Sequence, residues 1–348
     1  MKVCIYGAGA IGGWIGHKLA ASGCDVSVVA RGATLTALQQ HGLRLNEGGN
    51  ITAGQVRASA QPADLGIQDL VVLAVKAPAL ADVARHIAPL IGPETIVLTA
   101  MNGVPWWFLQ GFGGELANRR LTTVDPDGTL EKAIPAANII GCVVHASGLV
   151  DEPGLIRHHK GNTLIIGEPS GRKTARVEAL SALLAKAGFD APVSEQIQKD
   201  IWYKLWGNMT MNPISALTGA TSDLIMGDEL VCGFTSSVML EAKEIGARVG
   251  IPIDQTPAER HVITRKLGAV RTSMQQDVDA GRAIELDAIV GVVVEIARRV
   301  GMDTPNSASS SRMAGDMLTK PWPNSLKRSN SSSVNPTFSS QGFRKRML

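Results

Sequence analysis

Six residues near the start of the chain, G-A-G-A-I-G from Gly7 to Gly12, constrain its fold more than any other feature. They follow a short apolar run at residues 2–6 and open a stretch of helical character that ends at Gly23. A G-x-G-x-x-G pattern between a strand and a helix is typical of a turn that binds a dinucleotide. Gly7 makes the tight turn, Gly9 lets the backbone approach a pyrophosphate, and Gly12 allows close helix–strand contact. The free N–H groups at the helix N-terminus favour the phosphates. We therefore expect the loop to bind a dinucleotide through Gly7, Ala8, Gly9, Ala10, Ile11 and Gly12.

The end of the second predicted strand indicates which dinucleotide binds. That strand, D-V-S-V-V-A at residues 25–30, is followed by Arg31 and has no acid at its C-terminal end. An NAD site usually places a carboxylate there for the ribose 2′-hydroxyl. Asp25 stands at the wrong end of the strand. Because a guanidinium favours a 2′-phosphate and a carboxylate repels one, we expect NADP(H) as the cofactor.

The rest of the chain predicts two kinds of domain. Apolar runs at residues 69–76 and 95–103 are typical of buried parallel strands, with a helix at 78–92 between them. Strands that alternate with helices predict a doubly wound α/β sheet. From about residue 195 the sequence pattern is typical of helices. We expect them at residues 201–215, 231–250, 272–281 and 284–301. We place an α/β dinucleotide-binding domain at residues 1–195, an all-α domain at 196–319 and a tail at 320–348.

Composition narrows the functional classes. The 348 residues are 45% hydrophobic and 19% charged, and no charge-free run of about 18 apolar residues is present, so no transmembrane helix is expected. The four cysteines have no paired spacing, which indicates a reducing cytoplasm and neither disulfides nor a metal site.

The tail at residues 320–348 has six Lys or Arg and no acid, and without them 28 basic residues face 31 acidic ones. We interpret the tail as Ser-rich and disordered. We expect neither a nucleic-acid nor a membrane partner. An apolar segment such as Val290–Ile296 can be core or the interface of a homodimer, so the sequence leaves the oligomeric state open.

Several candidate residues lie where strands end. Lys76 ends the third predicted strand and Asn102 ends the fourth, and ligands of open α/β sheets bind outside the carboxyl ends of the strands. Trp106 and Trp107 follow closely, and they can either wall a substrate pocket or pack in a core. His158 and His159 are adjacent, and we expect a loop or surface role for them.

A second set of candidates shares one helix face. Lys204, Asn208 and Asn212 are spaced by four residues, which rotates successive positions by about 40° and keeps them on one side of a helix. One ammonium and two carboxamides suit a polar anion with a reducible carbonyl. A solvated helix face is the alternative interpretation of this spacing.

With these motifs, the sequence from residue 1 to about 305 resembles the ketopantoate reductases (2-dehydropantoate 2-reductases). The resemblance rests on GAGAIG, Arg31, V-K at Lys76, N-G at Asn102, E-P-G at Glu152–Gly154, K-L-x-x-N-x-x-x-N-P at Lys204–Pro213, S-M at Ser273 and E-L-D at Glu285–Asp287. It implies a Rossmann-like doubly wound domain followed by an all-α domain like the C-terminal domain of 6-phosphogluconate dehydrogenase. The implied reaction is the NADPH-dependent reduction of 2-dehydropantoate to (R)-pantoate, which belongs to pantothenate and coenzyme A biosynthesis.

The resemblance also implies roles for individual residues. Lys204 matches the general acid that protonates the ketone oxygen, and Glu285 close by would keep it protonated. Lys76, Asn102 and Glu285 match cofactor-contacting positions. The implied substrate-binding positions are Asn102, Lys204, Asn208, Asn212, Ser222 and Ser273.

Two departures from the family pattern keep other functions open. Ser222 stands where the family often has Asn, and V-P-W-W-F after Gly103 places large rings where smaller residues are common. A related NADPH-dependent reductase of a different 2-oxo acid is therefore an alternative. A non-catalytic NADP-binding regulatory protein is a further one.

Overall fold

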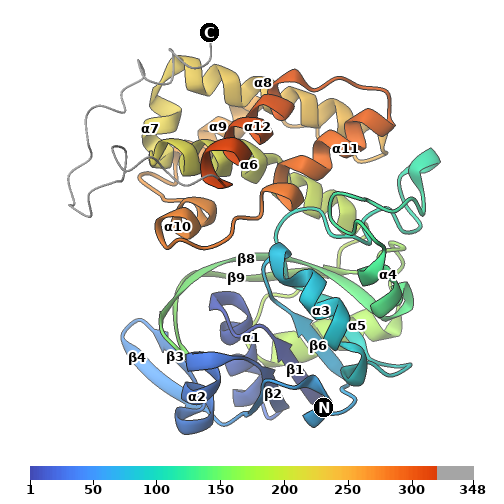
Figure 1. Cartoon of the computed structure of the whole chain (residues 1–348), viewed down its shortest axis with the longest axis vertical. Helices are drawn as coiled ribbons and strands as arrows, with labels where there is room; N and C mark the ends of the chain where they lie inside the picture. The colour runs from blue at the N-terminus through green and yellow to red at the C-terminus, as the bar shows by residue number, and fades with distance from the viewer. Residues whose placement is uncertain (320–348) are drawn as a thin grey trace. The chain divides into compact units, whose positions relative to one another are not determined.

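The computed structural model describes residues 1–319 of the chain (Figure 1). These residues form two compact units. The first comprises Met1–Lys204 and Val249–Ile251, and the second comprises Leu205–Arg248 and the described residues from Pro252 onward. The predicted tail at residues 320–348 lies outside the described residues, and the domain boundary expected near residue 195 stays a prediction.

The first unit is built on one nine-stranded sheet in the order β4-β3-β9-β8-β7-β6-β1-β2-β5. Its strands are β1 Lys2–Tyr6, β2 Asp25–Val29, β3 Leu43–Glu47, β4 Asn50–Gly54, β5 Arg57–Ser59, β6 Leu70–Leu73, β7 Ile96–Thr99, β8 Ile139–Glu152 and β9 Leu155–Gly167. Its helices are α1 Ala10–Ala21, α2 Gly32–His41, α3 Leu80–His86, α4 Thr129–Ala133 and α5 Ala175–Lys186.

Six of these strands form the parallel, doubly wound part of the sheet. On one side of β1 the sheet continues through β2 to β5, and on the other side it continues through β6 and β7 to β8. The strand order therefore reverses between β1 and β6, which is where doubly wound folds bind their ligands. The predicted fold class is confirmed, because the four apolar runs expected as parallel strands are β1, β2, β6 and β7.

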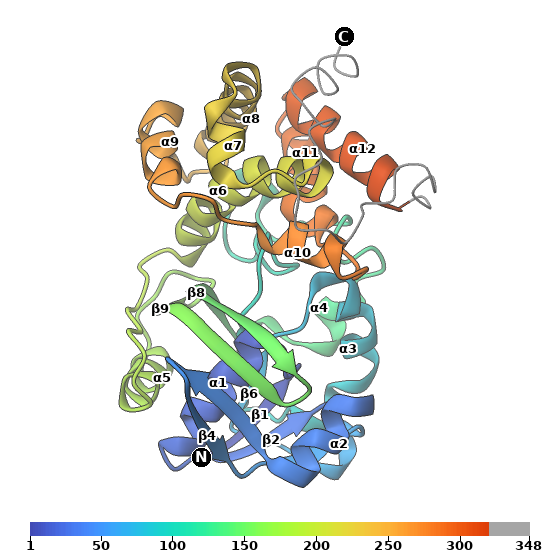
Figure 2. The same cartoon turned by 90° about the vertical axis from the view of Figure 1, so that its left-hand side faces the viewer.

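A long antiparallel hairpin, β8 and β9, is not among the elements that the sequence predicts. It lies against α1, as Figure 2 shows, where the Trp14 and His158 rings stack with centroids 5.0 Å apart. His158 and His159 both lie in β9 and not in a loop, while His159 is exposed, as the expected surface role requires. The polar and glycine-rich stretches within these two strands obscure the strand pattern.

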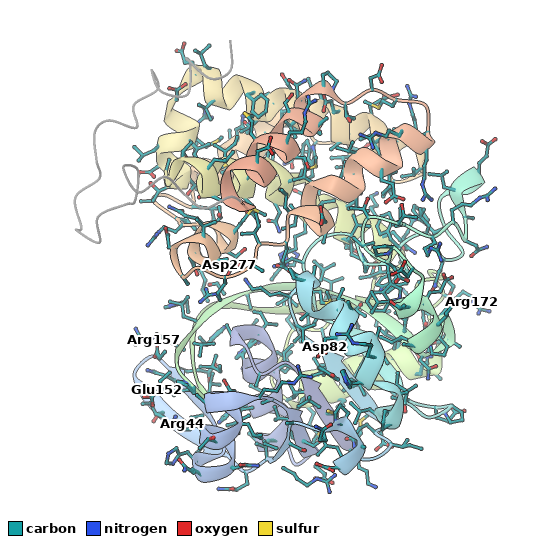
Figure 3. The ribbon with its side chains drawn as sticks, viewed as in Figure 1. Arg44, Asp82, Glu152, Arg157, Arg172 and Asp277 are labelled. Carbon is teal, nitrogen blue, oxygen red and sulfur yellow. The ribbon has the colours of Figure 1, made fainter. Side chains whose placement is uncertain are left out.

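The E-P-G segment makes the turn of this hairpin. Arg44 on β3 donates to Glu152 Oε1 at 2.9 Å and to the Pro153 carbonyl at 3.1 Å. Its backbone N–H donates to the Gly154 carbonyl at 2.9 Å. Figure 3 shows Arg44 and Glu152 close together at this turn. One arginine thus fastens the hairpin tip to the neighbouring strand.

The second unit is helical. Its helices are α7 Ser222–Gly227, α8 Glu229–Arg248, α9 Pro257–Arg265, α10 Ser273–Asp279, α11 Val292–Arg299 and α12 Pro305–Thr319, and α6 Ile197–Thr218 begins in the first unit and continues into the second. The helices expected at residues 201–215, 231–250 and 272–281 correspond to α6, α8 and α10.

The helix expected at residues 284–301 is interrupted. A π-helical turn at Asp287–Gly291 precedes α11. In this segment Val290, Val292, Val293 and Ile296 are fully buried. The apolar segment Val290–Ile296 is therefore core of this chain. None of the helices among residues 1–319 is long and apolar enough to cross a membrane.

Candidate functional site

The turn after β1 has the geometry expected of a dinucleotide loop. Gly7 adopts φ +103°, a left-handed conformation that side chains disfavour, and a Cβ at this position would lie 3.0 Å from the Ala74 carbonyl oxygen. At Gly12 a Cβ would overlap the carbonyl oxygen of Gly7. Both positions therefore require glycine, one for the turn and one for the close approach of α1.

The face of this loop that would meet phosphates is open. Apart from Gly9 itself and its two chain neighbours, no described residue has an atom within 4 Å of the position of a Cβ on Gly9, which precedes α1. The first turn of α1 contains no acidic residue, and no described side chain caps its N-terminus. The first N–H groups of a helix have no partner within the helix, so those at Ala10, Ile11 and Gly12 suit a pyrophosphate. The loop residues thus fit a dinucleotide.

The loops that follow β1, β6 and β7 begin next to one another at the carboxyl ends of these parallel strands. The strand register pairs Tyr6 with Leu73 and Leu73 with Thr99, so β1, β6 and β7 end at the same height. Lys76 follows β6 and is half-buried, and Asn102 follows β7 and is half-buried as well. Each lies three residues beyond the last residue of its strand, so both follow strand ends as predicted, and their contacts with a cofactor or substrate stay predictions.

Lys204 is held by two acceptors from this same edge. Its Nζ donates to Asn102 Oδ1 at 2.8 Å and to the Val144 carbonyl oxygen at 2.7 Å. Because Oδ1 accepts from the ammonium, the amide N–H2 of Asn102 points elsewhere and can serve a ligand. The sequence predicts both residues but not their hydrogen bond, which joins positions about a hundred residues apart.

The positive charge of Lys204 also acts on a buried thiol. Burial raises the pKa of Cys142 to about 12, and the Lys204 charge opposes that rise. Cys142 lies on β8, two residues before Val144, whose carbonyl accepts from Lys204. The thiol stays protonated at neutral pH and adds no charge beside the ammonium.

The amides expected to bind substrate follow Lys204 along α6. Asn208 is half-buried and Asn212 is 5% exposed. No hydrogen bond joins either side chain to another residue within the described part of the chain. Their donors and acceptors are therefore left for a ligand or for water.

The remaining predicted residues lie in the helical unit. Ser273 is exposed and begins α10, while Glu285 is buried and shortly precedes the π-helical turn. Such turns occur often at functional sites, and no sequence signal marks this one. Ser222 begins α7, and its hydroxyl donates to the Gly268 carbonyl at 2.6 Å. The substrate-binding roles of these residues stay predictions.

Arg31 lies two residues beyond the end of β2 and directly before the first residue of α2. Its Nη2 is 2.7 Å from Asp82 Oδ2 on α3, which Figure 3 labels. Burial is the largest single influence and raises the pKa of Asp82, but the hydrogen bonds from Arg31 and Arg85, with the charge of Arg31, together outweigh it and hold this pKa below its usual value. Arg31 is exposed, so its guanidinium is accessible to an anion.

Trp106 and Trp107 belong to the core. They are 4% and 0% exposed, and Phe108 beside them packs against Trp202 with ring centroids 6.0 Å apart. The sequence left open whether Trp106 and Trp107 line a substrate pocket or pack in a core, and their burial shows that they pack in a core. A depression of about 730 Å³ in the first unit lies between residues 169–171 and 192–200. None of the predicted site residues lines it.

Among the described residues, no group of three or more His, Cys, Asp and Glu side chains could hold a metal ion. The Gly7–Gly12 loop can bind a dinucleotide at the carboxyl ends of the strands, and the Lys204 ammonium is held at the same end of the sheet. The fold and these residues define an oxidoreductase of the dinucleotide-binding type.

Comparisons with known proteins identify the family. The family model "Ketopantoate reductase PanE/ApbA" matches residues 3–171, and its C-terminal counterpart matches residues 196–314. A 2-dehydropantoate 2-reductase from Mesorhizobium japonicum is 47% identical over 306 residues, which is 88% of this chain and 94% of that protein.

Solved structures agree with this assignment. A Ralstonia solanacearum MolK2 structure matches with a TM-score of 0.87 and 51% identity, covering 90% of this chain and 96% of the other. The 2-dehydropantoate 2-reductase of Geobacter metallireducens GS-15 matches with a TM-score of 0.80 and 25% identity, covering 91% and 99%. The chain belongs to the ketopantoate reductase family, whose members are NAD(P)-dependent oxidoreductases.

Proposed function

We propose that the chain reduces 2-dehydropantoate to pantoate with NADPH. The observation that carries this proposal is the Lys204 ammonium, hydrogen-bonded to Asn102 at the edge of the sheet where the Gly7–Gly12 loop begins. Membership of the ketopantoate reductase family and the 47% identity to a 2-dehydropantoate 2-reductase support the choice of substrate.

The bound nicotinamide would supply a hydride to the keto carbon. Lys204 then acts on the oxygen of that carbonyl. Its ammonium stabilises the negative charge that develops there and transfers a proton from Nζ to the oxygen. Asn102 and the Val144 carbonyl hold Nζ in place, which lowers the entropy cost of placing the acid. Asn102 acts as a positioning residue toward Lys204, and its amide N–H2 is available to the cofactor or the substrate.

The other roles follow the chemistry of each side chain. Asn208, Asn212 and Ser273 would donate to the carboxylate and hydroxyl of the substrate, and Ser222 belongs to the same proposed set. Lys76 and Glu285 would contact the cofactor, with Glu285 also favouring the charged form of Lys204. Arg31 would bind the 2′-phosphate, since a guanidinium matches a phosphate in charge and geometry.

One assay tests the substrate and the cofactor together. The loss of reduced-nicotinamide absorbance is followed with ketopantoate, with a panel of other 2-oxo acids, and with NADH in place of NADPH. We expect the highest kcat/KM for ketopantoate with NADPH. Turnover only of another 2-oxo acid would reassign the substrate and retain the mechanism. Saturable NADPH binding without turnover of any 2-oxo acid would contradict the proposed activity.

A further inference from the structure

Four side chains in the helical unit form a cluster around Cys232, outside the proposed cofactor and substrate residues. Cys232 and Thr235 lie on α8, and His261 and Arg265 lie on α9. The Cys232 Sγ is 3.3 Å from His261 Nδ1, and His261 Nε2 is 3.2 Å from Thr235 Oγ1. The Nη2 of Arg265 donates to the same sulfur at 3.7 Å.

The hydrogen bonds determine which imidazole nitrogen carries the proton. The Thr235 hydroxyl donates to the Cys232 carbonyl oxygen at 2.7 Å, so its oxygen can only accept from His261. The proton of the neutral imidazole is therefore on Nε2. The lone pair of Nδ1 faces the cysteine sulfur and can accept the thiol proton.

The surroundings of the pair favour a neutral imidazole beside the sulfur. Burial, together with the nearby Arg265 charge, lowers the pKa of His261, so the imidazole keeps its lone pair at neutral pH. The guanidinium of Arg265, 3.7 Å from the sulfur, would stabilise the negative charge that develops there as His261 takes the thiol proton.

The other cysteines of the chain lack these features. Burial raises the pKa of both Cys4 and Cys142 to about 12, which keeps them as thiols. Cys24 is half-buried like Cys232, but the group at its sulfur is the Ser22 hydroxyl, 3.8 Å away. A hydroxyl is no base at neutral pH, so Cys24 is a matched reference for Cys232 within the same molecule.

We propose that Cys232 is a nucleophilic thiol that hydrogen peroxide oxidises to a sulfenic acid, with His261 as its base. His261 Nδ1 takes the thiol proton, and the sulfur attacks one peroxide oxygen. The S–O bond forms as the O–O bond breaks, and the leaving hydroxide takes the proton back from the imidazolium and departs as water. The sulfur loses two electrons and the peroxide gains them, so one thiol and one peroxide give one sulfenic acid and one water. One small thiol condenses with the sulfenic acid to give a mixed disulfide and water, and a second small thiol then releases the Cys232 thiol by exchange and leaves as the small-molecule disulfide.

The test compares cysteines within the full-length, reduced chain. The protein is treated with hydrogen peroxide in the presence of dimedone, which traps sulfenic acids, and the labelled peptides are followed over time by mass spectrometry. We expect Cys232 to be labelled about ten times faster than Cys24 or more, because general-base assistance is worth about 10²-fold or more. Equal rates at Cys232 and Cys24 would overturn the proposal.

Two variants test whether fast labelling of Cys232 depends on His261 as a base or only on the exposure of the sulfur. His261→Gln keeps a hydrogen-bonding group but removes the base, and it should reduce the Cys232 rate to that of Cys24. Thr235→Val keeps the shape and removes the acceptor that fixes the tautomer, so it should slow Cys232 labelling while the melting temperature shows that the fold is kept. A Cys232 rate that neither variant changes would show that His261 is not its base.

Discussion

Two stretches of the helix α6 differ in how far the protein itself satisfies their polar groups. At Lys204 the protein supplies two acceptors for the ammonium, Asn102 and the Val144 carbonyl. One and two turns later, no hydrogen bond joins the Asn208 or Asn212 side chain to another described residue. This difference agrees with the two roles proposed for these residues, proton donation by Lys204 and substrate binding by the amides. A proton donor works best when it is already positioned, while groups that bind a substrate exchange water for the ligand.

The largest expected effect follows from the positioned donor. Lys204→Ala should lower kcat by about 10²- to 10⁴-fold, because the general acid and its charge are both removed. Lys199→Ala is the matched control, since Lys199 is an exposed lysine on the same helix. It should leave kcat unchanged. A Lys204→Ala enzyme with wild-type kcat would end the assignment of the general acid.

The unsatisfied amides give the next effect, on a different parameter. Asn208→Ala and Asn212→Ala should each raise KM for the 2-oxo acid about tenfold or more, since a hydrogen bond to a charged group is worth about 1.5–3 kcal/mol. Neither variant loses a hydrogen bond within the described chain, so the melting temperature should not fall for that reason. Steady-state kinetics and thermal melting are measured together. A lower melting temperature with unchanged KM would assign the amides to structure.

The features that the sequence predicts are local. The Gly7–Gly12 loop and the K-x-x-x-N-x-x-x-N spacing are determined by neighbours along the chain, so the phosphate turn and the residue set of α6 follow from the sequence alone. The buried apolar runs likewise predict the doubly wound sheet. The hydrogen bond between Lys204 and Asn102 becomes visible only in the fold, although each residue is a candidate from its own local pattern.

The features that escape prediction depend on distant contacts. The hairpin β8 and β9 is held by Arg44 on β3 and by the stacking of His158 on Trp14, and neither contact leaves a periodic signal in the sequence. The π-helical turn at Asp287–Gly291 arises inside an apolar run whose pattern predicts a continuous helix. The cluster around Cys232 joins residues about thirty positions apart on two helices, with no motif to mark it.

Arg31 is intermediate between Lys204 and the two asparagines. Its guanidinium pairs with a carboxylate of the protein and is also exposed to a ligand. Arg31→Ala should weaken NADPH binding about tenfold or more while changing NADH binding little, since only NADPH carries the 2′-phosphate. Asp82→Asn is the matched control, because it removes the partner that competes for the guanidinium. It should leave NADPH binding as tight or make it tighter. Titration of cofactor fluorescence measures these binding constants, and equal losses for NADPH and NADH in Arg31→Ala would contradict the role of the arginine.

The smallest expected effect concerns the Glu168 carboxylate, which accepts its hydrogen bonds from other residues of the protein. Glu168 is buried and accepts hydrogen bonds from Arg176 at 2.6 Å and 2.7 Å and from Thr174 at 2.6 Å. Burial raises the pKa of Glu168, but the hydrogen bonds from Arg176 and Thr174 outweigh it, so the pKa lies below the usual value of 4.5.

A carboxyl with a depressed pKa in the folded state contributes stability that is present above its unfolded pKa and is lost as the pH falls through the folded one. The free energy of unfolding should therefore decrease below a pH of about 4.5. Arg176→Gln should lower it at neutral pH by about 1–3 kcal/mol, and the difference from wild type should shrink in acid as Glu168 becomes protonated. The exposed pair Arg248 and Glu244 is the matched control, and Arg248→Gln should cost less than about 1 kcal/mol. Urea unfolding across this pH range measures both, and an Arg176→Gln deficit that is the same at every pH would show that Arg176 stabilises the fold by packing and not through the Glu168 charge.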